Sequence, residues 1–187
     1  MFPRRHRCTH GVLFYRDDAL LRERTSAYIA TALRAGQPGL VIARSDLLRQ
    51  VTIDLHRQHV QGAPFGPGRG EFVALDADAT LRQICVRDKP KAALFDLVVG
   101  GAVAKLARGG KRLAAYGEMV GILCDRGQYA DAVRLEEMWN GLLASADANL
   151  YCAYSAQLFE SPGGKEFRRQ IVEAHNELVE EGGLLQA

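Results

Sequence analysis

Short apolar runs alternate with longer helical segments along the chain, and this alternation predicts a mostly parallel sheet flanked by helices. The run at 39–43 is apolar throughout, which is typical of a strand buried on both faces of a sheet. Further strands are expected at 11–15, 72–76, 112–116 and 150–154. Helices are expected at 18–35, 46–59, 90–108, 128–145 and 165–185, with shorter ones around Leu81 and Ile122.

The helix expected at 128–145 carries a carboxylate inside its apolar stripe. Ala132, Glu136, Trp139 and Leu143 follow a 4-3-4 spacing and therefore form one row along the helix. An unpaired buried charge is costly, so Glu136 is expected to have a buried hydrogen-bond or ion-pair partner, or to contact a ligand. Trp139 is expected either in the core or against a ligand.

Composition narrows the possible functions of the chain. With 187 residues it has about the length of one domain. Its 24 basic and 22 acidic side chains leave a formal charge of +2, which favours neither nucleic acid nor an anionic membrane as a partner. Its apolar runs fall short of the roughly 18 residues of a membrane span, and its start resembles no secretion signal. We therefore expect a cytoplasmic protein.

The turn after the first expected strand lacks the residues of a phosphate-binding loop. A P-loop requires GxxxxGK[ST] at this place, whereas residues 14–19 read FYRDDA, with two carboxylates that repel phosphate. The glycines of the GPGRG run at 66–70 precede a strand instead of following one, and are expected in a mobile loop. The sequence therefore predicts neither ATP binding nor ATP hydrolysis, and it indicates no other cofactor.

The turn from Tyr116 to Met119 leads from a strand into a helix. Ligands of open parallel sheets bind outside the carboxyl ends of the strands, where such turns lie. Glu118 is expected at the N-terminus of the helix, either as a cap or in contact with a ligand. A pocket for a small, largely apolar molecule is expected at this edge of the sheet. The candidate ligand-binding residues are His10, Tyr15, Asp76, Tyr116, Glu118, Glu136, Trp139 and Tyr154.

Histidines and cysteines offer a second possible chemistry. His6, Cys8 and His10 would share one face of an extended segment and could begin a zinc site. No fourth ligand has a diagnostic spacing, so no metal is predicted, and the sequence leaves open whether these three bind one. The four cysteines form no CxxC pair and are expected to be free thiols, as in a reducing cytoplasm. His175 is expected on the apolar face of the last helix.

Three segments together resemble the MEDS domain, the sensory domain of methanogens and methylotrophs and of the dichloromethane-responsive regulator. They read RLAAYGEMVGIL at 112–123, RLEEMWNGL at 134–142 and LYCAY at 150–154. The resemblance covers about residues 8–160. It implies a RecA/KaiC-like core without a working P-loop, which senses a small molecule and passes the signal to an output domain. Hydrocarbon derivatives are the ligands proposed for the family.

No output domain is recognisable in this chain, so its signal is expected to leave through a partner protein or a homodimer that uses the final helix. We expect residues 1–160 to form the sensory domain and residues 161–187 a C-terminal helical extension. The alternative function is a ligand-free interaction module, such as a signalling adaptor or partner-switching protein. An enzyme is not expected, because no second titratable group is predicted to converge on Glu118 or Glu136.

Overall fold

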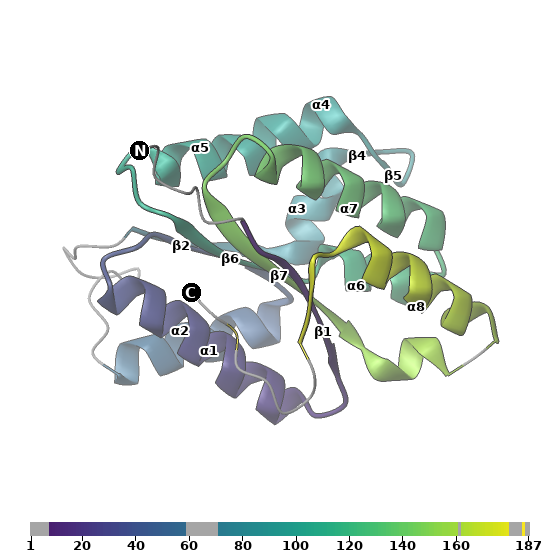
Figure 1. Cartoon of the computed structure of the whole chain (residues 1–187), viewed down its shortest axis with the longest axis horizontal. Coiled ribbons are helices and arrows are strands. Elements are labelled where there is room, and N and C mark those ends of the chain that lie inside the picture. The colour runs from purple at the N-terminus through teal and green to yellow at the C-terminus, as the bar shows by residue number, and fades with distance from the viewer. Residues whose placement is uncertain (1–7, 59–70, 161, 180–184, 186–187) are drawn as a thin grey trace, which may run out of the picture.

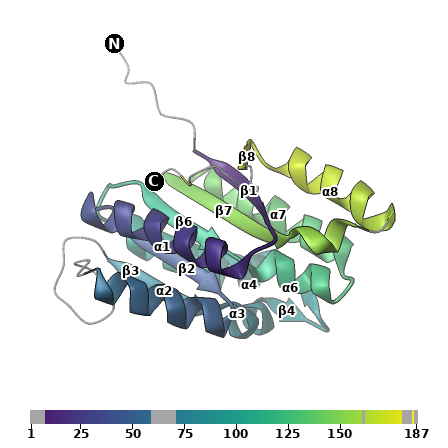
Figure 2. The ribbon, with the colours of Figure 1, turned by 90° about the horizontal axis from the view of Figure 1, so that it is seen from below.

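Six strands form one sheet in which every neighbouring pair is parallel, in the order β3-β2-β6-β7-β1-β8 (Figures 1 and 2). The computed structural model describes residues 8–58, 71–160, 162–179 and 185, so His6 and the GPGRG run lie outside the described residues. The strands are β1 (His10–Tyr15), β2 (Gly39–Ala43), β3 (Phe72–Asp76), β6 (Leu113–Gly117), β7 (Ala148–Ser155) and β8 (Glu177–Val179). The sequence-based prediction of a parallel sheet flanked by helices is confirmed.

Helices cover both faces of this sheet. One face carries α1 (Asp18–Arg34) and α2 (Ser45–Arg57), which lie in front of the sheet in Figure 2. The other face carries α3 (Ala77–Ile84), α4 (Ala92–Phe95), α5 (Gly101–Ala107), α6 (Met119–Asp125), α7 (Tyr129–Leu143) and α8 (Pro162–Ala174). The π-helical turn η1 (Asp96–Gly100) joins α4 to α5, and the strands β4 (Cys85–Val86) and β5 (Lys89–Pro90) form a small antiparallel pair.

Side chains along β1 and β7 alternate between the two faces of the sheet, and the register of the two strands decides which of them meet. In the parallel register His10 lies opposite Leu150, Val12 opposite Cys152 and Phe14 opposite Tyr154. Successive side chains of a strand point to opposite faces. Val12, Leu150, Cys152 and Tyr154 therefore share the core under α7 and α8, whereas Leu13, Tyr151 and Ala153 pack under α1 and α2.

The C-terminal segment differs from the single helix expected at 165–185. The helix α8 ends at Ala174, and β8 then joins the edge of the sheet beside β1. Asn176 fixes this change of direction, because its backbone N–H donates to the His10 carbonyl and its Oδ1 accepts from the His10 N–H, each at 2.9 Å. The residues after Asn176 are extended and form strand hydrogen bonds with the edge of β1, which would be unpaired if the helix continued.

The apolar stripe of α8 is already covered within the chain. Phe167 and Ile171 are 3% and 0% exposed and belong to the core under α7. The expectation that this stripe pairs with a second copy is therefore wrong, because the chain's own core buries it.

A second difference concerns Pro90. It was expected to open a helix, but it lies in β5, and α4 begins at Ala92.

The turn between β1 and α1 explains why a nucleotide is not expected. The Asp17 carboxylate caps α1 and accepts from the backbone N–H groups of Ala19 and Leu20, at 2.7 and 3.3 Å. A P-loop protein uses such helix N-terminal N–H groups for phosphate. Here a carboxylate of this chain occupies them, and its charge repels a phosphate.

We therefore expect the full-length protein to bind Mg-ATP no more tightly than millimolar. Isothermal titration calorimetry with Mg-ATP measures this directly. A dissociation constant in the low micromolar range would contradict the interpretation of the turn.

Candidate functional site

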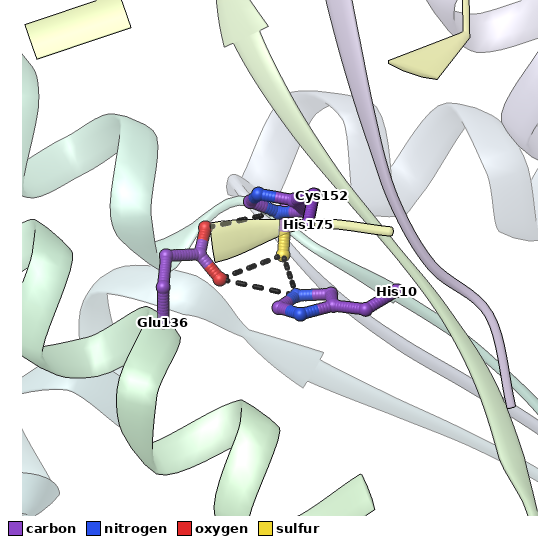
Figure 3. Close-up of side chains that lie close together, drawn as sticks. All are labelled: His10, Glu136, Cys152 and His175. Atoms are coloured by element: carbon purple, nitrogen blue, oxygen red, sulfur yellow. Dashed lines mark hydrogen bonds and ion pairs between the residues drawn. The ribbon is translucent and has the colours of Figure 1, made fainter. Parts of the chain in front are cut away.

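Four side chains with proton- or metal-binding atoms converge under α7 and α8: His10, Glu136, Cys152 and His175. They come from β1, α7, β7 and the residue after α8, and one ligand atom from each lies within 4.8 Å of all the others. Figure 3 shows the Glu136 carboxylate reaching from α7 toward both imidazoles and the thiol. We call these four residues the buried cluster.

The Glu136 carboxylate is the centre of the buried cluster. Its Oε2 lies 3.1 Å from His10 Nε2 and 3.6 Å from Cys152 Sγ, and its Oε1 lies 3.5 Å from His175 Nε2. The Tyr154 hydroxyl donates a hydrogen bond to Oε1. The side chains of His10, Glu136 and His175 are at most 2% exposed. The expected buried partner of Glu136 is thus found, and it consists of several groups.

The neighbours of the two imidazoles determine which ring nitrogen carries the proton. Asn140 Nδ2 donates to the Ala174 carbonyl at 2.9 Å, so its Oδ1 is the atom that faces His10 Nδ1 at 2.8 Å. An amide oxygen only accepts, so His10 Nδ1 must donate. His175 Nδ1 likewise lies 2.6 Å from the Ile171 carbonyl and must donate to it. In their neutral forms both imidazoles therefore present an unprotonated Nε2 to Glu136.

Burial and charge determine the protonation of the other groups. Burial by itself would raise the pKa of Glu136, but His175, then His10 and Tyr154, bring this pKa below its usual value. Burial lowers the pKa of His175, against the opposing effect of Glu136. Burial also raises the pKa values of the Cys152 thiol and the Tyr154 phenol well above their usual range. At neutral pH the buried cluster therefore contains a carboxylate, a thiol and a neutral His175.

The buried cluster is poorly suited to nucleophilic catalysis. A thiol reacts as its thiolate, and Cys152 is a fully buried thiol with a raised pKa. Two imidazole nitrogens, a carboxylate and a sulfur are, however, the ligand types that transition metals prefer. The arrangement can hold a metal ion, or it can hold protons that join the four elements together.

A groove of about 640 Å³ lies next to the buried cluster, at the end of β1. It is bounded by β1, the short 3-10 helix η2 (Ala156–Phe159), α8 and β8. Its lining residues are Phe14, Arg16, Ala156, Phe159, Glu160, Lys165, Arg168, Leu178 and Val179. The aromatic ring of Phe14 lies 6.1 Å from that of Tyr154, centroid to centroid, so one layer of side chains separates the groove from Glu136.

The carboxyl ends of the strands hold a smaller, polar crevice of about 150 Å³. Tyr15, Arg44, Glu118 and Asp125 line it, and an Arg44–Asp125 ion pair lies across it. The Glu118 carboxylate accepts from the backbone N–H of Arg44 at 2.8 Å. Burial raises the pKa of Glu118. Burial, and to a smaller extent the nearby charge of Glu118, raises the pKa of Tyr15 to about 12. This crevice therefore differs from the largely apolar pocket expected at this edge.

The structure brings five of the eight predicted ligand-binding residues together, in two places. His10, Glu136 and Tyr154 meet in and beside the buried cluster, and Tyr15 and Glu118 meet in the strand-end crevice. The other three have structural surroundings. Trp139 packs edge-on against Phe95, Tyr116 is buried under α1 and α2, and Asp76 caps α3 and accepts from Ser45.

Sequence reasoning missed Cys152, His175 and Asn140. Strand alternation offered a signal for Cys152, because it places this residue on the same face as Tyr154 in LYCAY. Asn140 follows Glu136 by four residues and so lies beside it on α7. His175 gave no such signal, since it was expected within a helix that in fact ends before it.

Comparison with known families adds one finding. The sequence model of MEDS, described as the methanogen/methylotroph, DcmR sensory domain, matches residues 9–175. This range includes all four residues of the buried cluster and the whole of α8. No curated protein matches the chain.

Proposed function

Because this chain belongs to the MEDS family of sensory domains, we propose that it senses a small molecule with a largely apolar body and one anionic group. The observation that carries this proposal is the lining of the groove between β1, η2, α8 and β8. A volume of about 640 Å³ is in the range of small-molecule sites. The groove therefore replaces the strand-end crevice as the proposed ligand site.

The side chains of the groove account for both parts of the proposed ligand. Phe14, Phe159 and Val179 offer an apolar wall. Arg16, Lys165 and Arg168 bring three positive charges against the single carboxylate of Glu160, which pairs with Arg16 at 3.1 Å. The Arg168 guanidinium lies over the Phe14 ring at 4.2 Å, where it can bind a carboxylate while the apolar body lies against Phe159 and Val179.

The same groove offers a path for the signal. Two of its walls, α8 and β8, belong to one segment, residues 164–179, whose junction is fixed by His175 in the buried cluster and by Asn176 on β1. A ligand that binds these walls changes the stability of this segment. We propose that a partner protein or a second copy of the chain reads that change. Among the described helices none is long and apolar enough to cross a membrane.

Hexanoate is a suitable probe, since it combines a short apolar chain with one carboxylate. When hexanoate is titrated into the isotope-labelled protein and followed by NMR, we expect the amide chemical-shift changes to lie mainly in η2, α8 and β8. Hexan-1-ol should bind more weakly, and hexylamine most weakly. Arg168→Gln should weaken hexanoate binding about tenfold, the effect of losing one charge-assisted hydrogen bond of about 1.5 kcal/mol.

Arg169→Gln is the matched control. Arg169 is the next residue on α8, but it pairs with Glu166 and Glu173 and does not line the groove. It should leave hexanoate binding unchanged. Shift changes centred on Arg44, Glu118 and Gly121, or equal weakening by both variants, would place the ligand elsewhere and refute the proposal.

A further inference from the structure

We propose that His10, Glu136, Cys152 and His175 bind one divalent transition-metal ion such as Zn²⁺. The ligand atoms are the Nε2 atoms of both histidines, a carboxylate oxygen and the cysteine sulfur. In tetrahedral Zn²⁺ sites such atoms lie about 3.3–3.7 Å apart, given metal–ligand distances of about 2.0–2.3 Å. The His10–Glu136, His10–Cys152 and Cys152–Glu136 atom pairs, at 3.1, 3.6 and 3.6 Å, lie near this spacing, and all four ligand atoms lie within 4.8 Å of one another.

The proton positions favour a cation between these atoms. His10 Nδ1 and His175 Nδ1 both donate away from the buried cluster, to Asn140 and the Ile171 carbonyl. In their neutral forms both imidazoles therefore turn an Nε2 lone pair toward the Glu136 carboxylate, as the ligands around a bound cation do. Among the described residues His175 Nε2 is buried and makes no hydrogen bond, although Glu136 Oε1 lies 3.5 Å away.

The groups around the proposed ligands have the form of a metal site's outer shell. Metal-binding histidines usually donate their second N–H to a carbonyl or carboxylate, which fixes the ring. Asn140 Oδ1 and the Ile171 carbonyl do this here. Tyr154 donates to Glu136 Oε1 and so orients the carboxylate. Asn140 is exposed at the surface of α7, so a single side chain separates His10 from solvent and from an incoming ion.

Charge balance is consistent with a divalent ion. When the metal enters, the Cys152 S–H bond breaks, its proton leaves to solvent, and a metal–sulfur bond forms. The thiolate and the Glu136 carboxylate then carry two negative charges, which the ion neutralises. The loaded site then carries no net charge, and each lone pair obtains a partner.

Cobalt provides the test, because Co²⁺ occupies Zn²⁺ sites and absorbs light. The full-length protein, freed of metal with a chelator, should bind one Co²⁺ per chain. We expect the visible bands of tetrahedral Co²⁺ together with a near-ultraviolet band from thiolate-to-metal charge transfer, and both should disappear when Zn²⁺ is added. Asn140→Ala should weaken Co²⁺ binding about 10–100-fold, as is typical of an outer-shell partner.

Matched variants separate this site from other thiols and carboxylates. Cys152→Ser should abolish the charge-transfer band, whereas Cys8→Ser and Cys85→Ser should retain it. Glu136→Gln and His175→Gln should weaken binding at least as much as Asn140→Ala, and Glu137→Gln, on the exposed side of α7, should not. Loss of the band in Cys8→Ser or Cys85→Ser, or absence of any tetrahedral Co²⁺ spectrum in the unmodified protein, would overturn the proposal. Neither result depends on hexanoate binding.

Discussion

Replacing Glu136 with alanine is expected to lower the free energy of unfolding by about 3–5 kcal/mol, the usual cost of breaking a buried charged network. The carboxylate is 0% exposed and is the shared partner of His10, His175 and Tyr154. Its removal leaves the buried Tyr154 hydroxyl and the buried Cys152 thiol without their acceptor. Urea unfolding followed by circular dichroism measures the change.

Glu137→Ala is the control for this prediction. Glu137 is the next residue of α7 and is exposed, so the same substitution should change the free energy of unfolding by about 0.5 kcal/mol or less. Equal urea midpoints for the two variants would show that the Glu136 network contributes little to stability.

A chain that ends after Glu160 is expected to lose cooperative folding. This truncation removes Phe167, Ile171 and Val179, which are 3%, 0% and 5% exposed. Burial of such side chains contributes about 1.5–3 kcal/mol each, so their combined loss is comparable with the total stability of about 5–15 kcal/mol of a typical domain. It also exposes the edge of β1 and removes His175 from the buried cluster. Near-ultraviolet circular dichroism and thermal unfolding should show no sharp transition.

Two point variants test whether the loss of stability comes from the core contacts of this segment. Ile171→Ala, at a position that is 0% exposed, should cost about 2–5 kcal/mol. Leu178→Ala, at a position that is 45% exposed, should cost much less. If the truncated chain is a folded, cooperatively unfolding monomer, the segment is an appendage and the proposed path of the signal fails with it.

The most reliable predictions came from residue patterns within single helices and strands. The run at 39–43 became β2 without a change of bounds, because a fully apolar strand fits only the centre of a covered sheet. Glu136 was located correctly because helical spacing alone places it in the stripe with Ala132 and Trp139. The free thiols were also predicted correctly.

Contacts between distant elements were the part that the sequence could not provide. Glu136 meets His175 only because the chain turns at Asn176 and adds β8 beside β1. That turn depends on the hydrogen bonds of one side chain to residues more than 160 positions earlier, which no local pattern encodes. The strand-end crevice was expected from topology, but its polar lining depends on the ion pair between Arg44, just before α2, and Asp125, at the end of α6.

Hydrogen–deuterium exchange of residues 164–179, with and without saturating hexanoate, tests the central claim that this segment reports the ligand. The account predicts slower amide exchange in α8 and β8 when hexanoate is bound, with unchanged exchange in α2 on the opposite face of the sheet. Unchanged exchange in α8 and β8 under the same conditions would contradict it.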